Sequence, residues 1–308
     1  MASPALDVFH ALDSALASAV AIAAGSTVHV ARNHHRGHRF GGGGTGIVWS
    51  DDLVVTSSFH TPDHTTVGLP LADGNLDERE AEVIGRDPGT DVAVLRVKGG
   101  GLTPASFRDL DGLAVGNLAF AVGRPGKTAR ASLRAIGVLG PEVATPRGGT
   151  LDRYVESDRQ IPRGFAGGPL IDADGAVIGL NTRTVVRGAD LAVPTVTLRR
   201  VVEELVKHGG IRRGYLGVGA YPVALPAALG QTLGRDRGAL LASLEEDGAA
   251  TRAGLLLGDI LLALDGDPIT GPESLRDALA GRADKQVTVT ILRAGQTQDL
   301  VITIGSRS

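Results

Sequence analysis

The chain has 308 residues, no cysteine and a formal net charge of −3 at pH 7. This length favours two domains, and the near-neutral charge gives no electrostatic basis for binding nucleic acid. The lack of cysteine excludes disulfides, thiolate nucleophiles and cysteine-ligated metal sites, although it leaves the compartment open. Aromatic residues are scarce and Gly and Pro are frequent, which suits a mainly β protein with many turns.

The first segment, residues 4–24, predicts an amphipathic helix. Large apolar side chains recur along it at spacings of three and four: Leu6, Phe9, Leu12 and Leu16. Its most apolar stretch, residues 15–24, is too short to span a bilayer. Asp7 and Asp13 stand where a secretory signal would carry Lys or Arg. We therefore expect no signal peptide, no membrane span and a cytoplasmic location.

A predicted strand at residues 28–30 leads into a loop rich in His and Arg, with His34, His35 and His38 close together. Such a loop could bind a metal ion or an anion, or sense pH. Metal ligation, however, needs fixed geometry and usually carboxylate or thiolate help, which this loop does not offer. We expect a solvated loop, no metal site and no cofactor. The glycines at residues 41–44 are not followed by the Gly-Lys-Ser/Thr of a phosphate-binding loop.

Short apolar segments predict a succession of strands, at residues 28–30, 46–49, 53–56, 82–84 and 91–97. Further along, glycines are dense at residues 164–168, where they let backbone N–H groups converge and the chain reverse sharply. This loop reads G-F-A-G-G-P-L and resembles the nucleophile loop G-N-S-G-G-P-L of the HtrA (Deg) family of trypsin-like serine proteases.

Six further motifs resemble that family and occur in its order. They are G-T-G-I-V-W from residue 44, V-T-S-S-F-H-T from residue 55, D-P-G-T-D-V-A-V-L from residue 87, A-F-A-V-G-R-P from residue 119, V-E-S-D from residue 155 and A-D-L-A-V-P from residue 189. Together they cover nearly all of residues 25–210. The resemblance implies the double β-barrel of trypsin-like proteases, and an N-terminal segment that helps to build a homotrimer.

The resemblance also assigns the catalytic positions. The triad acid falls on Asp91, the base position on Phe59, the nucleophile position on Ala166, and an oxyanion-hole amide on Gly164. Acyl transfer by a serine needs all three triad members, and two of them are absent. A histidine does follow at His60, but one step along the chain turns a side chain away, so it is a weak substitute base. Nearby hydroxyls, those of Ser57, Ser58 and Ser157, are expected to be turn and strand-end groups.

Residues 197–208 predict an amphipathic helix that Thr197 caps and that Gly209 and Gly210 end. The composition changes near residues 209–212. The expected organisation is therefore an N-terminal helix at residues 1–24, a protease-like domain at residues 25–210 and a further domain at residues 211–308.

The run A-A-T-R-A-G-L-L-L-G-D-I-L-L-A-L-D-G, from residue 249, resembles an α+β PDZ domain of the HtrA type. A helix is expected at residues 272–280 and paired strands at residues 286–292 and 298–304. PDZ domains bind extended peptides by β-augmentation and hold the terminal carboxylate on backbone N–H groups. The implied peptide-binding residues are Tyr215, Leu216, Gly217 and Val218 in the carboxylate loop, and Leu275 and Leu279 on the facing helix. Both helix leucines could instead be core residues, and for Leu279 the two interpretations are equally favoured.

These observations favour a non-catalytic HtrA-like protein that binds C-termini or unfolded peptides as a scaffold, adaptor or chaperone-like protein, and forms a homotrimer. The alternative is an active serine endopeptidase of protein quality control, with His60 as base or with a triad altered in the laboratory. A single laboratory substitution would explain Ala166 but not Phe59. By family resemblance, the alternative location is the periplasm.

Overall fold

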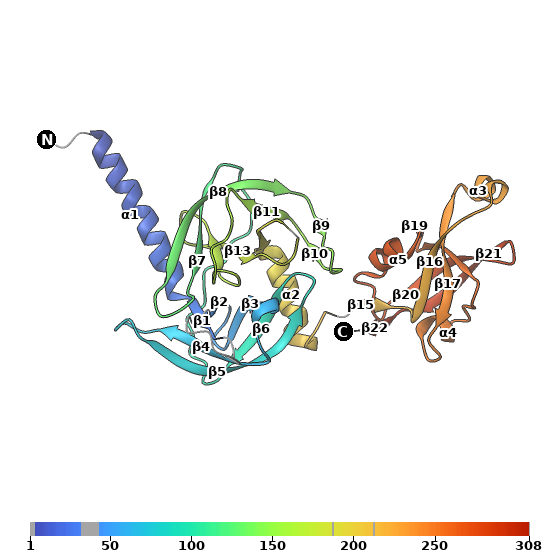
Figure 1. Ribbon diagram of the computed structural model, residues 1–308, viewed down its shortest axis with the longest axis horizontal. Coiled ribbons are helices and arrows are strands. Elements are labelled where there is room, and N and C mark those ends of the chain that lie inside the picture. The colour runs from blue at the N-terminus through green and yellow to red at the C-terminus, as the bar shows by residue number, and fades with distance from the viewer. Residues whose placement is uncertain (1–3, 32–42, 187, 212, 308) are drawn as a thin grey trace. The chain divides into compact units, whose positions relative to one another are not determined.

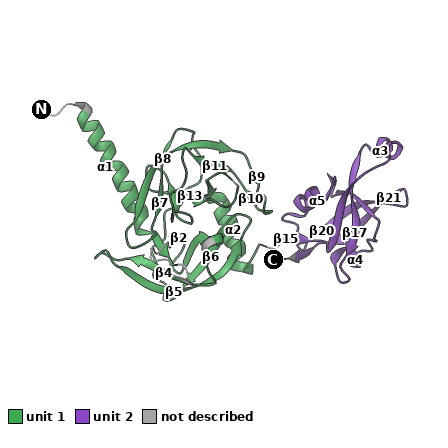
Figure 2. Ribbon diagram, viewed as in Figure 1, with its two compact units in different colours: residues 1–211 green, residues 212–308 purple. Residues whose placement is uncertain are grey.

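The computed structural model describes residues 4–31, 43–186, 188–211 and 213–307. It describes the backbone alone for Pro4, Ala5, His60, Arg213 and Arg307. The chain divides into two compact units, residues 1–211 and residues 212–308 (Figure 2). The histidine-rich loop with His34, His35 and His38 lies outside the described residues, so its expected solvation stays a prediction.

The first unit is built around two closed six-stranded antiparallel barrels (Figure 1). The first barrel contains β1 (Thr27–Val30), β2 (Gly44–Val48), β3 (Leu53–Ser57), β4 (His64–Pro70), β5 (Leu76–Asp87) and β6 (Val92–Val97). The second contains β7 (Leu118–Gly123), β8 (Arg130–Gly140), β11 (Tyr154–Ser157), β12 (Pro169–Ile171), β13 (Val177–Thr182) and β14 (Leu191–Pro194). A small hairpin, β9 (Val143–Ala144) and β10 (Thr150–Leu151), is inserted between β8 and β11. This architecture confirms the double β-barrel expected from the sequence.

Each barrel has its own apolar interior, and a larger cluster joins the two. Val28, Val54 and Leu95 are fully buried inside the first barrel, and Val155 and Ile178 inside the second. The joining cluster takes side chains from both barrels and from α2 (Thr195–His208). Burial of one such side chain contributes about 1.5–3 kcal/mol to the stability of the fold. Because the joining cluster is shared, the two barrels pack against each other at their junction.

Helix α2 begins two residues earlier than the sequence predicts. Pro194 is its N-cap residue, and Gly209 ends it in the left-handed conformation, as expected. The prediction that Thr197 caps the helix is wrong, because Thr197 is buried inside it. Its hydroxyl donates to Asp152 Oδ2 at 2.8 Å and thereby anchors the helix to the turn after β10.

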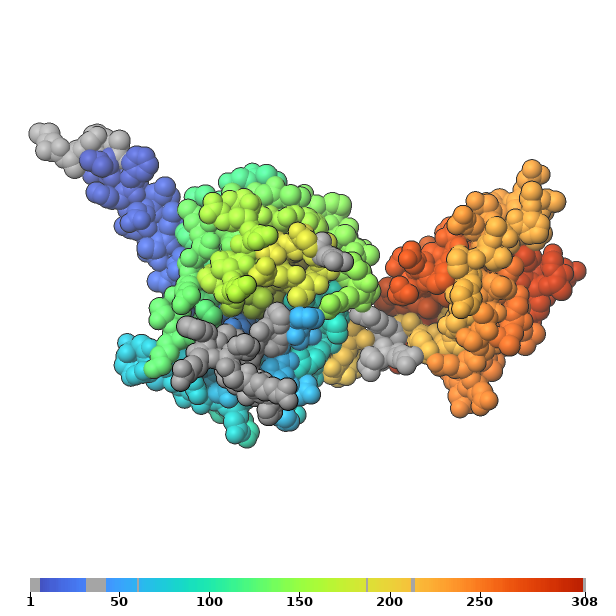
Figure 3. Space-filling model, viewed as in Figure 1, coloured from blue at the N-terminus to red at the C-terminus, as the bar shows by residue number. Residues whose placement is uncertain are grey.

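Helix α1 (Pro4–Gly25) is confirmed, but the prediction about its apolar length is wrong. Residues 6–25 form a window long and apolar enough to cross a membrane, and only 11 % of it is buried. The expectation rested on residues 15–24 alone, whereas the longer window adds only two Asp, Glu, Lys or Arg residues, Asp7 and Asp13. A signal sequence near an N-terminus passes the same test. In Figure 3 the N-terminal part of the helix projects from the barrels. Leu6, Phe9 and Leu12 are exposed, whereas Ala19 and Ala23 are buried where the helix packs against β1, β7 and β12.

The second unit is an α+β fold around one sheet, in which β16 is an edge strand. Along the sheet the order is β16 (Val218–Ala224), β17 (Arg237–Leu244), β18 (Ile260–Leu264), β20 (Gln286–Arg293) and β21 (Gln296–Thr303), with β19 (Asp267–Pro268) paired to β18. The remaining elements are β15 (Arg213–Tyr215) paired with β22 (Gly305–Arg307), and the helices α3 (Ala227–Leu233), α4 (Ala249–Arg252) and α5 (Pro272–Leu279). The unit has its own hydrophobic core. The expected α+β fold is confirmed.

Candidate functional site

Asp91 lies just before β6, at the junction of the two barrels, and is 1 % exposed. Its backbone is left-handed (φ 59°), a conformation that aspartate tolerates better than most residues. Ser57 Oγ, at the end of β3, donates to both carboxylate oxygens at 2.9 Å. The hydroxyl of Thr182, at the end of β13, donates to Oδ2 at 2.7 Å. The buried carboxylate therefore bonds to both barrels through neutral hydroxyls.

Phe59, at the expected base position, lies in the short 3-10 helix η1 (Ser58–His60) that follows β3. Its backbone N–H donates to Asp91 Oδ1 at 2.9 Å, so it is adjacent to the acid. Its ring, however, is 57 % exposed and has no group that can exchange a proton. His60 follows in the same helix, and its side chain lies outside the described residues.

An arginine lies over the Phe59 ring. The Arg147 guanidinium carbon is 5.4 Å from the ring centroid, within range of a cation–π interaction. Arg147 belongs to the β9–β10 turn, which is attached to the Asp91 loop: Thr145 Oγ1 donates to the carbonyl oxygen of Gly89 at 2.8 Å. An added Cβ at Gly149 would lie 2.5 Å from the carbonyl carbon of Gly89, so the two turns are in close backbone contact.

The glycine-rich loop that carries Ala166 packs against the first barrel. Gly167 has φ 85°, and a Cβ there would lie 2.3 Å from Thr45 O and 2.7 Å from the Ser57 nitrogen. Only glycine fits this approach. The Gly167 N–H donates to the carbonyl oxygen of Asn181 at 2.8 Å, which ties the loop to β13. Ala166 is thereby held next to the end of β3.

The loop retains free backbone donors. Gly164 has φ 83°, and its carbonyl accepts the Thr45 hydroxyl at 2.6 Å. Within the described part of the chain, neither the Gly164 N–H nor the Ala166 N–H donates to a protein acceptor. Two such amides at the nucleophile loop are the donors from which an oxyanion hole is built. A carbonyl oxygen bound there would meet no hydroxyl at Ala166.

The fold thus brings Asp91, Phe59 and the Ala166 loop together at the barrel junction. The contacts of Ser57 and Thr182 with Asp91 were not predicted from the sequence. Ser57 was expected to be a strand-end hydroxyl, and no role was expected for Thr182. Both residues do end strands. The signal available was their position as the last residues of β3 and β13, the two strands that flank the predicted site.

In the second unit, Tyr215, Leu216, Gly217 and Val218 connect β15 to the edge strand β16. Gly217 has φ 76°, which permits a tight turn. The carbonyl oxygens of Leu216 and Gly217 accept the N–H groups of Ala250 and Glu245 at 2.8 and 2.9 Å. These bonds fix the turn against the segment that joins β17 to α4.

Leu275 and Leu279 project from α5 into the core of the second unit, where Leu216 is also buried. Val218 is partly buried against the same cluster. Helix α5 packs beside β16, so the leucines and the expected carboxylate loop border one region. Whether these leucines also contact a peptide stays a prediction.

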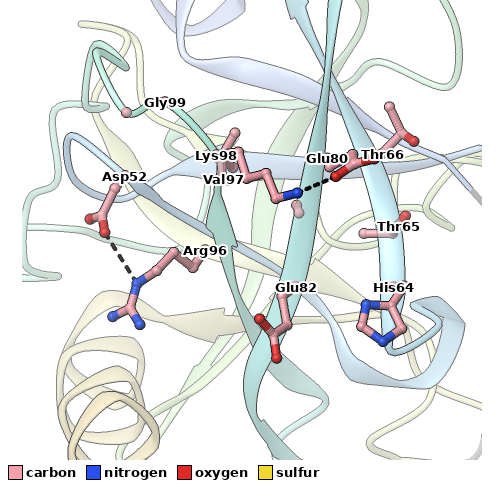
Figure 4. A pocket seen from close by; sticks show the side chains of 12 residues that line it. Asp52, His64, Thr65, Thr66, Glu80, Glu82, Arg96, Val97, Lys98 and Gly99 are labelled. Carbon is pink, nitrogen blue, oxygen red and sulfur yellow. Dashed lines mark hydrogen bonds and ion pairs between the residues drawn. The ribbon is translucent and has the colours of Figure 1, made fainter.

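A hollow of about 830 Å³ lies elsewhere, over β4, β5 and β6 (Figure 4). Its charged side chains are largely paired: Lys98 with Glu80 at 2.5 Å and Arg96 with Asp52 at 3.3 Å. The Lys98 ammonium lowers the pKa of the exposed Glu80 carboxyl. Across the described residues, no group of three or more His, Cys, Asp or Glu side chains is arranged to hold a metal ion.

Comparison with known proteins agrees with this architecture. A family signature described as a trypsin-like peptidase domain matches residues 44–180, and one described as a PDZ domain matches residues 241–293. A solved structure of a variant of the HtrA-type protease AlgW, with a decapeptide, superposes with a TM-score of 0.74 at 26 % identity, covering 95 % of this chain and 98 % of that one. The chain is therefore similar in sequence and fold to an HtrA-type protease over nearly its whole length.

Other relatives show the same similarity. The chain is 31 % identical over 273 residues to the probable periplasmic serine endoprotease DegP-like of Brucella suis biovar 1 (strain 1330), covering 85 % of this chain and 52 % of the relative. A serine endoprotease from Yersinia pestis superposes with a TM-score of 0.69 at 25 % identity, over 95 % and 98 % of the two chains. The chain spans about half the length of the curated relatives it matches.

Proposed function

We propose that this HtrA-like chain binds peptide segments without cleaving them. The main supporting observation is that two of the predicted catalytic positions hold inert side chains. Ala166 occupies the predicted nucleophile position, and an exposed Phe59 lies beside Asp91. A methyl group cannot attack a carbonyl, and a phenyl ring cannot accept the proton that an attacking hydroxyl must lose. In another serine protease, loss of the serine or the histidine alone costs about 10⁶ in turnover.

The surroundings of Asp91 support the proposal. Its carboxylate accepts the hydroxyls of Ser57 and Thr182 and the N–H of Phe59, an arrangement that stabilises the barrel junction without a histidine. The Arg147 guanidinium lies over the Phe59 ring. This contact gives the phenyl ring a packing role, which a catalytic imidazole at this position would not need. Asp91 thus retains a structural role after catalysis is lost.

The second candidate function, an active endopeptidase with a substitute nucleophile, finds less support. The hydroxyls in contact with Asp91 are those of Ser57 and Thr182, which are only 2 % and 0 % exposed, so a substrate carbonyl cannot reach them. A laboratory Ser→Ala change would account for Ala166 alone. Phe59 at the predicted base position would also abolish catalysis, and a single laboratory change cannot explain both residues. We therefore infer that the site is naturally degenerate.

A cleavage assay tests the proposal. The purified chain, Ala166→Ser, Phe59→His and the double variant Phe59→His/Ala166→Ser are incubated with casein and with a fluorophosphonate that labels reactive serines. We expect no turnover above background except in the double variant, which should exceed either single variant by at least about 10²-fold, because the triad acts as one unit. Serine-directed turnover by the unaltered chain would contradict the proposal.

Peptide binding is assigned to the PDZ unit. Its edge strand β16 has a strand neighbour, β17, on one side and α5 on the other, the arrangement that β-augmentation requires. The solved AlgW structures contain a decapeptide or a tripeptide, which supports peptide binding by a relative. Replacement Gly217→Arg should fill the carboxylate loop and abolish capture of a fluorescent peptide library by the purified chain.

We further propose that the chain forms a homotrimer. The supporting observation is the row of exposed apolar side chains on α1, including Phe9, which is 67 % exposed. Sedimentation equilibrium should give the trimer mass, and a monomer at micromolar concentration would contradict this proposal.

The cytoplasmic expectation loses its basis, because it assumed that α1 is too short for a membrane. The apolar window at residues 6–25 and the relatives named as periplasmic favour a location outside the cytoplasm. Residues 1–31 fused to alkaline phosphatase should give an enzyme that is active in a bacterial host, since this reporter needs an oxidising compartment for its disulfides. An inactive fusion would restore the cytoplasmic interpretation.

A further inference from the structure

Within the described part of the first unit, three exposed arginines at the barrel junction have no anionic partner. Most other lysines and arginines of this unit donate to an oxygen atom, as Arg200 does to Asp152 at 2.8 Å. The described lysines and arginines of the unit that form no hydrogen bond or ion pair are Arg130, Arg147, Arg163 and Lys207. Lys207 belongs to the last turn of α2, whereas the three arginines border the loop that carries Ala166.

Two of these arginines lie on segments that meet at this loop. Arg147 lies over the Phe59 ring, in the short helix that follows β3. The end of β3 packs against the loop, since a Cβ added at Gly167 would lie 2.7 Å from the last backbone nitrogen of that strand. Arg163 belongs to the loop itself, three positions before Ala166.

Arg130 borders the same loop from the second barrel. It begins β8 and pairs with Gly123, at the end of β7. A Cβ added at Gly123 would lie 2.6 Å from the ring of Phe165, so this end of the β7–β8 hairpin is in direct contact with the loop. The three arginines therefore lie around the predicted nucleophile position.

The carboxylates of this region are buried or paired. Asp87 and Asp91 are 2 % and 1 % exposed and accept hydrogen bonds from neighbouring N–H and hydroxyl groups. Asp158 and Asp190 each form an ion pair with another arginine. Glu142 is exposed, but it lies at the base of the β9–β10 hairpin rather than at its turn. The exposed charges around the loop are therefore mainly positive.

The loop also offers hydrogen-bond donors to an anion. Among the described residues, the N–H groups of Gly164 and Ala166 have no protein acceptor. Guanidinium groups and free backbone N–H groups both form charge-assisted hydrogen bonds with carboxylates. An acidic side chain near this loop would therefore find both an opposite charge and donors.

We propose that the barrel junction binds extended chain segments rich in Asp and Glu, which Arg130, Arg147 and Arg163 attract. This inference rests on the proposed peptide binding without cleavage and adds a second binding surface with a defined ligand class. The net charge of −3 on the whole chain does not oppose it, because salt screens charges beyond about 10 Å. Nucleic acid is a poorer match, since the described residues of the junction expose a single aromatic ring, that of Phe59, on which a base could stack.

Calorimetry with blocked peptides tests the inference. An acetylated and amidated decapeptide of alternating Glu and Thr is titrated into the full chain carrying Gly217→Arg, which removes the proposed PDZ contribution. The matched peptide has Gln in place of each Glu. We expect the Glu peptide to bind at least about tenfold more tightly, because several ion pairs contribute. Raising the salt from roughly 50 to 500 mM should weaken its binding, because exposed charges are screened.

Single substitutions identify the arginines responsible. Arg130→Gln, Arg147→Gln and Arg163→Gln should each weaken binding of the Glu peptide about two- to fivefold, the size expected of one exposed ion pair. The double variant Arg147→Gln/Arg163→Gln should weaken it about tenfold, since separate contacts add. The matched control Arg153→Gln removes an exposed arginine of the same barrel, which donates to the carbonyl oxygen of Gly140, and should change nothing.

Three results would overturn the inference. They are equal binding of the two peptides, an equal loss on Arg153→Gln and Arg163→Gln, and tighter binding of a single-stranded oligothymidylate than of the Glu peptide. The proposed function is judged separately. If the Glu peptide does not bind but the chain with an unaltered Gly217 still captures the peptide library, only this inference fails. Turnover of casein by the unaltered chain would remove the proposed function and, with it, the basis of the inference.

Discussion

Asp91, at the predicted position of the triad acid, has a structural role at the junction of the two barrels. Its carboxylate lies between the barrels and accepts hydrogen bonds from Ser57, Phe59 and Thr182, while its backbone adopts a left-handed conformation. A buried carboxylate with these donors stabilises the folded state whether or not a histidine is present.

Replacement of Asp91 should therefore destabilise the chain. Asp91→Ala leaves buried donors unpaired and forces alanine into the left-handed region, which costs about 3 kcal/mol in total. Asp91→Asn tolerates that conformation and retains acceptors, so its cost should be about 1 kcal/mol. Urea unfolding followed by fluorescence of Trp49, the single tryptophan, measures both. If both variants were as stable as the unaltered chain, Asp91 would be dispensable to the fold.

Phe59 and Ala166 were identifiable from sequence because each sits within a short contiguous motif. The contact of Arg147 with Phe59 was not, because it joins residues 88 positions apart through a hairpin that the sequence did not predict. Likewise, Thr182 and Asp91 are separated by 91 residues. Local patterns identify residue types but do not pair distant ones.

Among the elements, strand β20 of the PDZ unit is joined to the start of β18 by a buried ion pair. Arg293 donates to both oxygens of Asp259, at 2.8 and 2.7 Å, and the Leu256 N–H donates to Oδ2 at 2.8 Å. Burial acts to raise the pKa of Asp259, but the hydrogen bonds from Arg293 and Leu256 outweigh it and hold the pKa below its usual value.

This depressed pKa predicts an acid-dependent stability. Because Asp259 loses its proton more readily in the folded state, its contribution is fully present above the unfolded pKa of about 3.9 and is lost as the pH falls through the lower folded value. Asp259→Asn should lower the melting temperature of the PDZ unit at pH 7 by roughly 5 °C. It should also flatten the loss of stability below about pH 4. Circular dichroism measures thermal unfolding at each pH. If Asp259→Asn lost stability below about pH 4 as steeply as the unaltered chain, Asp259 would not be the cause of the acid dependence.

At the scale of the whole molecule, the chain consists of two units with separate cores. Trp49 packs on Phe107 at a centroid distance of 4.5 Å in the first unit, and the second unit has no tryptophan. Tryptophan fluorescence therefore reports the barrels alone, while circular dichroism reports both units.

We expect calorimetry to show two unfolding transitions, of which only one coincides with the fluorescence change. Residues 212–308 produced alone should reproduce the other transition, because their apolar side chains pack within the unit. A single transition that all probes share, or an unfolded fragment, would show that the two units depend on each other for stability.

The sequence by itself determined the two-unit organisation, the β-barrel and PDZ-like folds, and which residue types stand at the predicted nucleophile and base positions. These follow from short contiguous motifs and from strand and helix periodicity, which are local properties of the chain. Only the tertiary structure decided that Ser57 and Thr182 bond to Asp91, that Arg147 covers Phe59, and that Glu245 lies against Gly217. Each of these contacts joins segments that are distant along the chain, and long-range packing, rather than local pattern, brings them together.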